Sequence, residues 1–272
     1  MDLYLIIVII MLALAVSGLV VGVANDAVNF LNSALGSKAA PRYVIMTVAS
    51  VGIIVGAITS NGMMEVARSG VFHPEMFTFA EVMLLFLAVM FTNVILLDIF
   101  NTLGMPTSTT VSLVFGLLGA AVGISIFKIA NDALVTLPDG SLATMADMIN
   151  TGNAMAIIGG ILISVVIAFV CGTVVMYITR LIFSCRYQSK LKSYGAVWCG
   201  IALTAISYFA VFKGLKGTQV IPADWMSWME GHIPMMLGGL LVGWSLIMSI
   251  LSMLKVNILR ITVLAGTFSL AL

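Results

Sequence analysis

The chain has 272 residues, of which 61% are hydrophobic and only 8% charged, and its net charge is +1. A soluble domain carries about 25% charged residues, so this chain has too few charges to cover a water-facing surface. We therefore expect an all-α polytopic transmembrane helical bundle, with no basic surface for a nucleic-acid partner.

Hydrophobic stretches of spanning length recur along the chain. They lie at about 3–24, 41–60, 78–99, 107–127, 154–182, 194–212 and 233–254. The third and fourth stretches form either two spans or a re-entrant hairpin. A last apolar run, 261–272, would reach only about 18 Å as a helix, short of a ~30 Å hydrocarbon core. We therefore expect the sequence to be a fragment that ends in mid-helix.

The loop charges predict an orientation. If the segments alternate, one side of the membrane receives Lys38, Arg42, Arg180, Arg186, Lys190, Lys192, Lys255 and Arg260. The other side receives Arg68, Lys128, Lys213 and Lys216. Because the side richer in Lys and Arg is normally cytoplasmic, the N-terminus is expected outside.

The first apolar stretch contains a polar motif, residues 22–29 (GVANDAVN). Its side chains Asn25, Asp26 and Asn29 are spaced so that a helix places them on one face. A carboxylate near membrane depth is costly and is by default read as functional. Because Gly18 and Gly22 lower the helix propensity here, we expect a broken first helix whose free backbone groups and Asp26 coordinate a cation and a substrate oxygen. The alternative is that Asn25 and Asp26 only cap a second helical segment.

A second polar motif, residues 101–110 (NTLGMPTSTT), separates the third and fourth apolar stretches. Proline suits the first turn of a helix, so the hydroxyl residues after Pro106 are expected in the opening turns: Thr107, Ser108, Thr109 and Thr110. Their hydroxyls, the free N–H groups and the helix dipole can form an anion site without Lys or Arg. The alternative is an ordinary hydroxyl-rich helix start. Asp98, at the end of the preceding stretch, either joins the site or marks the membrane interface.

Together the two motifs resemble the inorganic phosphate transporter family, often called PiT. The family's G-A-N-D-V-A-N-type motif in the first helix is matched by residues 22–29, with Val23 in place of the usual alanine. Its G-x-P-V-S-T-T-H-type motif is matched by residues 104–110, with Thr107 in place of the usual valine and Val111 at the histidine position. Between them, residues 65–70 (EVARSG) resemble the family's E-T-I-R-K-G segment. This makes Glu65 and Arg68 candidates for coupling or gating.

The resemblance implies a fold of two inverted repeats, each with one N-D motif; this chain has one copy and would form the first repeat. It implies symport of inorganic phosphate with sodium or a proton, without a cofactor, by a protein of the bacterial inner membrane that forms a homodimer. Asn25, Asp26 and Asn29 would bind the coupling ion, with sodium at Asp26. Asn25, Asn29 and the hydroxyl residues 107–110 would bind phosphate.

The expected organisation is a motif-bearing transport core at 1–127, a polar outer loop at 128–153, and further transmembrane helices at 154–272. Two alternatives to phosphate symport stay open: an anion channel, and a transporter of another tetrahedral oxyanion such as sulfate. An enzyme is not expected, because no nucleophile or metal ligand set with a nearby base is placed at membrane depth.

Overall fold

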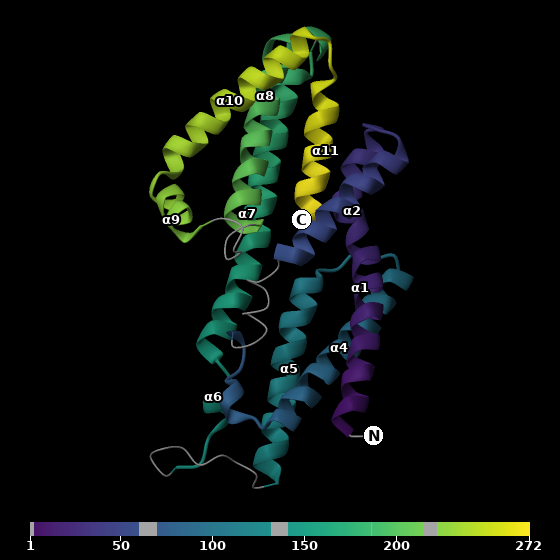
Figure 1. Ribbon diagram of the computed structural model, residues 1–272, viewed down its shortest axis with the longest axis vertical. Helices are drawn as coiled ribbons and strands as arrows, with labels where there is room; N and C mark the ends of the chain where they lie inside the picture. Colours follow the sequence, from purple (N-terminus) through teal and green to yellow (C-terminus); the bar gives the residue numbers. More distant parts are fainter. Residues whose placement is uncertain (1–2, 60–69, 132–140, 186, 215–221) are drawn as a thin grey trace. The chain divides into compact units, whose positions relative to one another are not determined.

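The computed structural model describes residues 3–59, 70–131, 141–185, 187–214 and 222–272, and these ranges are mostly helical (Figure 1). The helices are α1 (Leu3–Gly36), α2 (Arg42–Thr59), α4 (Phe79–Thr102), α5 (Thr109–Ala130), α6 (Met145–Met148), α7 (Thr151–Phe183), α8 (Tyr187–Phe209), α9 (Ala223–Gly231), α10 (Ile233–Met253) and α11 (Ile258–Ala271). A 3-10 turn, Pro74–Met76, precedes α4.

Within these ranges, seven helices are long and apolar enough to cross a membrane: α1, α2, α4, α5, α7, α8 with its extension to Phe212, and α10. Each overlaps one predicted hydrophobic stretch, which confirms a polytopic helical bundle and an integral membrane protein. α4 has 24 residues and α5 has 22, so each has the length of a full span. The re-entrant alternative for this pair stays a prediction. α11 is a shorter apolar helix of 14 residues.

The expected break in the first helix is wrong, because α1 continues for 34 residues through the polar motif. Glycine costs only about 1 kcal/mol in a helix interior, and packing offsets that cost here. A Cβ added to Gly22 would lie 3.6 Å from Thr109 Cγ2 and 3.9 Å from Leu97 Cδ1, so α1 approaches α4 and α5 closely at this point. The motif therefore supplies polar side chains rather than freed backbone groups.

The chain folds into two compact units. One contains Met1–Val28 and Gly62–Ile167, and the other contains Asn29–Asn61 and Ala168–Leu272. The division falls inside α1 and inside α7, so each of these helices contributes to both units. No linker in the sequence marks either point.

In the first unit, α4 and α5 pack against each other as a hairpin. Their buried side chains form a core with the segment before α4 and with α6: Val71, Phe72, Phe77, Leu85, Val89, Val114, Leu117, Ala121, Ala143, Met148 and Ile149. An isolated antiparallel bridge between Phe72 and Ile149 joins the segment before α4 to the segment after α6. Beside it, the His73 N–H donates to the Met148 carbonyl at 2.9 Å.

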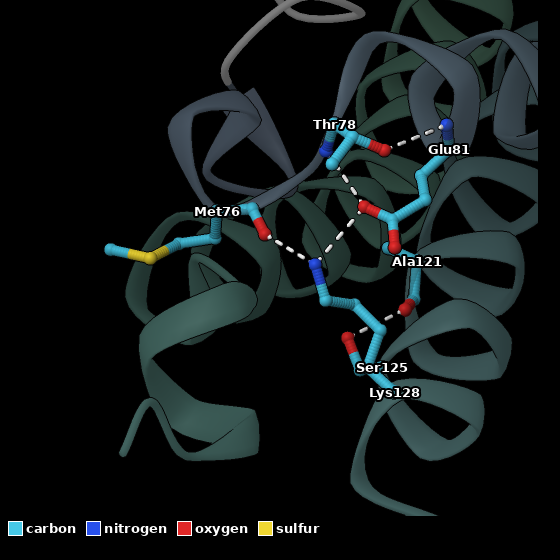
Figure 2. A network of polar contacts seen from close by, with 6 residues as sticks. All are labelled: Met76, Thr78, Glu81, Ala121, Ser125 and Lys128. Carbon is cyan, nitrogen blue, oxygen red and sulfur yellow. Dashed lines mark hydrogen bonds and ion pairs between the residues drawn. The ribbon is translucent and has the colours of Figure 1, made fainter. Parts of the chain in front are cut away.

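A buried lysine ties the end of α5 to the segment before α4. Lys128 is 2% exposed, and its Nζ donates to Glu81 Oε2 and to the Met76 carbonyl, both at 3.0 Å (Figure 2). The ammonium group also lies 5.5 Å from the centroid of the Phe77 ring, within cation–π range. Its charge is thus compensated inside the unit. The sequence prediction placed Lys128 in a loop, but α5 continues to Ala130 and includes it.

Glu81 has a second role at the start of α4. Its Oε2 accepts the N–H of Thr78 at 2.7 Å, while the Thr78 hydroxyl accepts the N–H of Glu81 at 3.4 Å (Figure 2). This reciprocal capping box satisfies backbone donors that a helix start otherwise leaves free. One carboxylate therefore both starts α4 and holds Lys128.

Replacing Lys128 by alanine should destabilise the protein by about 2 kcal/mol, because it leaves a partly buried carboxylate without its cation. The double variant Glu81→Gln/Lys128→Met should recover much of the loss, since it leaves no unpaired charge and glutamine can still accept the Thr78 N–H in the capping box. Thermal unfolding of the purified protein in detergent, followed by fluorescence-detected size exclusion, measures both effects. Lys190→Ala is the control, since Lys190 is exposed and lies 5.5 Å from the Tyr194 ring. A Lys128→Ala protein as stable as the wild type would contradict a stabilising role for the pair.

In the second unit, α8 packs against α10 and α11, and α11 also packs against α2. Two of these crossings depend on glycine. A Cβ on Gly200 of α8 would overlap the Ser245 hydroxyl and lie 3.0 Å from the Ser245 Cα. A Cβ on Gly52 of α2 would lie 2.8 Å from the Phe268 carbonyl oxygen of α11. Helix backbones approach this closely only where the facing residue has no side chain.

Gly200→Ala should lower the thermal stability by an amount equivalent to about 1–3 kcal/mol, the usual cost of overpacking. Gly239→Ala is the matched control, because a Cβ at that position of α10 meets nothing within 4 Å. The control should be neutral or slightly stabilising, since alanine is the better helix former. Equal melting temperatures for the two variants would show that the α8–α10 crossing tolerates a larger separation.

Candidate substrate and ion site

The polar segment between α4 and α5 begins with a tight helix end. Gly104 has a φ of +68°, and its N–H donates to the Asn101 carbonyl at 3.0 Å. The next N–H, of Met105, donates to the Phe100 carbonyl at 2.9 Å. This pair of bonds with glycine in the left-handed region is a common way to end a helix. It starts the turn that leads from α4 to α5 through residues 103–108.

α5 begins later than the sequence predicted. Ser108 caps the helix, with its Oγ accepting the Val111 N–H at 3.3 Å, and Thr109 is the first helical residue. Pro106 therefore lies outside the helix, and its predicted place in the first turn is wrong. The serine cap satisfies a free N–H group, and this outweighs the preference of proline for the first turn. Two of the four predicted hydroxyl residues thus precede the helix, and two begin it.

Asn25 joins the two motifs within the first unit. Its Oδ1 accepts the Thr107 N–H at 2.8 Å. Its Nδ2 donates to Asn101 Oδ1 at 2.8 Å and to the Met105 carbonyl at 3.4 Å. Asn101 in turn donates its Nδ2 to the Val21 carbonyl at 3.0 Å. Asn25 is only 3% exposed, and a buried amide needs such partners for its oxygen and its nitrogen.

Asp26 lies beside the start of α5. The Thr109 Oγ1 donates to Asp26 Oδ2 at 3.1 Å. Since a helix N-terminus carries a partial positive charge, it stabilises a carboxylate placed there. The structure thus brings together the acid of the first motif and the first helical hydroxyl of the second, which are 83 positions apart in sequence.

The hydroxyl residues differ in their exposure. Thr107 and Thr109 are half-buried beside α1, whereas Ser108 and Thr110 are exposed. Carboxylate, amide and hydroxyl oxygens are the hard ligands that an alkali or alkaline-earth cation prefers. The first N–H groups of α5 have no acceptor within their own helix and favour an anion. This end of α5 therefore offers ligands for a cation and donors for an anion close to each other.

Four further residues were predicted for the site or its coupling: Asn29, Asp98, Glu65 and Arg68. Asn29 lies one turn beyond Asn25 on α1, in the second unit. Asp98 is exposed on α4, one turn before Asn101. Glu65 and Arg68 lie outside the described residues. The predicted coupling or gating roles of these residues stay predictions.

The structure adds polar residues that the sequence reasoning did not select. Asn101 is the direct partner of Asn25. Asn93 lies two turns earlier on α4, and its Oδ1 accepts the Ser112 hydroxyl of α5 at 2.7 Å. The sequence signal that could have identified Asn93 and Asn101 is an amide side chain within or at the end of an apolar helix. Burying such an amide costs free energy unless it has a hydrogen-bond partner.

Comparison with known proteins shows the family of the chain. The model of the phosphate transporter family matches residues 22–233, which include both motifs and most of the chain. The chain therefore belongs to the phosphate transporter family, as the motifs predicted.

A protein of Thermococcus kodakarensis named "Putative phosphate permease TK2061" is 26% identical to the chain over 200 residues. The aligned part covers 72% of this chain and 45% of that relative, so the chain spans about half the length of the relative. No solved structure matches the chain significantly.

Thr109→Val should lower the stability by roughly 1 kcal/mol, because it keeps the size of the side chain but removes a hydrogen bond to a carboxylate. Thr109→Ser should retain most of the stability, since its hydroxyl can still reach Asp26. Thr110→Val is the control, at an exposed position in the same turn. The measurement is the melting temperature in detergent. If Thr109→Val and Thr110→Val melt alike, the bond between Thr109 and Asp26 contributes nothing to the fold.

Proposed function

We propose that this chain carries a phosphate and coupling-cation site of a secondary active transporter, formed by Asp26 of α1 and the start of α5. The observation that supports this most strongly is the contact of Thr109 Oγ1 with Asp26 Oδ2. It places an ionisable acid next to a hydroxyl-rich helix N-terminus in a membrane protein of the phosphate transporter family. On this proposal the chain serves transport and not catalysis.

The carboxylate explains why the transport should be coupled to a cation. Asp26 and an incoming phosphate anion repel each other, and a sodium ion or a proton at Asp26 removes that repulsion. Moving one net negative charge into a cell also costs about 2.3 kcal/mol per 100 mV of inside-negative potential. Cotransported cations offset this cost. Sodium at Asp26 is the preferred assignment.

The start of α5 would hold phosphate without a cationic side chain. Thr107, Ser108, Thr109 and Thr110 bring hydroxyl groups, and α5 brings its first N–H groups and its dipole. The buried Lys128 lies 19 positions beyond Thr109 (128 − 109) on the same helix, or ~28 Å along its axis, and is paired with Glu81. Neutral donors bind an anion less tightly than an Arg clamp would, which suits a site that must also release its substrate.

The same arrangement favours phosphate over sulfate. Near neutral pH phosphate retains a P–OH group, which can donate a hydrogen bond to a carboxylate such as Asp26. Sulfate has no such proton and would present only acceptors to Asp26. A site that accepts a hydrogen bond from a substrate hydroxyl discriminates strongly against an analogue of the same shape that lacks it.

The wider setting is also a proposal. The N-terminus would lie outside a bacterial inner membrane, according to the distribution of Lys and Arg. A second N-D motif would complete the site in an inverted repeat, and rocking of the repeats would give alternating access. Homodimer formation and a gating or coupling role of Glu65, Arg68 and Asp98 rest on the family resemblance.

The test is uptake of radiolabelled phosphate into proteoliposomes that contain the gene product in which this chain occurs, with an imposed sodium or proton gradient. Uptake should require one of the two gradients, should be lost in Asp26→Asn, and should be inhibited by arsenate more than by sulfate. Asp224→Asn is the control, because Asp224 is an exposed acid on α9.

Other outcomes have separate meanings. Normal coupled uptake by Asp26→Asn would remove Asp26 from the mechanism. Flux that does not saturate and does not depend on either gradient would indicate an anion channel. Preferential inhibition by sulfate would indicate a different oxyanion as substrate.

A further inference from the structure

Asn101 is the residue of this region whose role neither the motifs nor the proposed function explains. It lies in the last turn of α4, before the turn that leads to α5. Its Nδ2 donates to the Val21 carbonyl of α1 at 3.0 Å, and its Oδ1 accepts from Asn25 at 2.8 Å. Asn101 therefore connects α4 to the backbone of α1 and to the first side chain of the N-D motif.

The chemistry of the amide groups gives this connection a direction. A carbonyl oxygen can only accept, so Asn101 must turn its Nδ2 toward Val21 and its Oδ1 toward Asn25. Asn25 must then turn its Nδ2 toward Asn101, which directs its own Oδ1 at the Thr107 N–H. The Thr107 backbone N–H can only donate, so it needs the Asn25 Oδ1 in this position. The Val21 carbonyl at one end of the series and the Thr107 N–H at the other therefore require the same orientation of the two amide side chains. Two backbone groups thus determine the orientation of both side chains.

This arrangement fixes the entry into α5. The Asn25 Oδ1 holds the Thr107 N–H at 2.8 Å, two positions before Thr109. Asp26 follows Asn25 directly on α1, and Thr109 donates to Asp26 at 3.1 Å. The bond between Asn25 and Thr107 therefore sets how closely the start of α5 lies to the carboxylate, while Asn101 keeps Asn25 in the orientation that makes this bond.

We propose that Asn101 is a positioning residue: it orients Asn25, which in turn holds the start of α5 against Asp26 with the spacing that cation and phosphate need. The effect of Asn101 on transport rests on the proposed function. Its effect on the orientation of Asn25 rests on the hydrogen bonds alone. Asn25 then acts through its bonds within the protein, and the ligands for the transported ions come from Asp26 and the hydroxyl residues.

The variant that tests this is Asn101→Asp, which has nearly the same size but cannot donate to Val21 when ionised. Asn101→Ala, which removes the whole amide, is the second variant. Asn131→Asp is the control, because Asn131 caps the other end of α5, is exposed, and donates its Nδ2 to the Phe127 carbonyl at 2.8 Å. Amounts of folded protein are equalised by size exclusion before each measurement.

The first readout is hydrogen exchange, which does not depend on transport. In the wild type the Thr107 amide, resolved with overlapping peptides that cover residues 105–110, should exchange slowly, since its N–H is bonded to a buried acceptor. In Asn101→Asp and Asn101→Ala this amide should exchange about tenfold faster, as the loss of one or two hydrogen bonds would give. The control should leave it unchanged. Equal exchange in all four proteins would overturn the proposed orientation of Asn25.

The second readout is phosphate uptake in proteoliposomes. Both Asn101 variants should raise the KM for phosphate and the half-saturating cation concentration by about tenfold, with a smaller change in the maximal rate. A lower maximal rate at unchanged KM would mean a merely structural role and would overturn the proposal. If the wild type itself does not transport phosphate, the proposed function fails, and the exchange data still decide the role of Asn101.

Discussion

Two short polar segments, one in the middle of a helix and one between two helices, are held together by the hydrogen bond from the Thr107 N–H to the Asn25 Oδ1. In a hydrocarbon environment no water can replace a missing partner, so polar groups at membrane depth must be satisfied within the protein. Once Asn25 and Thr107 meet, Asp26 reaches the first turn of α5, and Asn101 completes the set by joining Asn25 to the α1 backbone. The continuous form of α1 is compatible with the same constraint, because a continuous helix bonds its own backbone groups and its side chain Asn25 contacts Met105 and Thr107.

Lys128 and Asp26 have different surroundings in the first unit. The Lys128 charge is matched by Glu81, by a carbonyl and by an aromatic ring, so it has a fixed partner and stabilises the end of the hairpin. Asp26 is placed against a hydroxyl and a helix N-terminus, which stabilise a carboxylate without neutralising it. A fixed ion pair suits a structural role, whereas a carboxylate beside a hydroxyl-rich helix start suits the cation site proposed above. This difference separates the stabilising end of α5 from its proposed transport end.

Hydrophobicity and length were enough to predict the seven spans, since a run of about 20 apolar residues has few other stable forms. The two motifs were enough to predict the family, and two pairs of their residues are in contact: Asn25 with Thr107, and Asp26 with Thr109. The break in α1 and the place of Pro106 were predicted wrongly, because local propensities of about 1 kcal/mol are overridden by packing against Thr109 and by the Ser108 cap. The bond between Asn25 and Asn101 spans 76 positions and the pair of Glu81 and Lys128 spans 47, and no periodicity in the sequence connects such distant side chains.

On the proposed function, a cation and phosphate bind together at Asp26 and the start of α5. The most direct test is equilibrium binding of radiolabelled phosphate to the purified protein at constant pH over a range of sodium concentrations, matched by sodium binding over a range of phosphate concentrations. Each ligand should tighten the binding of the other by the same factor, as linkage requires for two ligands that favour one state. If a proton replaces sodium as the coupling ion, the phosphate affinity should instead follow pH beyond the ionisation of phosphate itself. Phosphate binding that responds to neither cation would rule out a shared site for cation and phosphate.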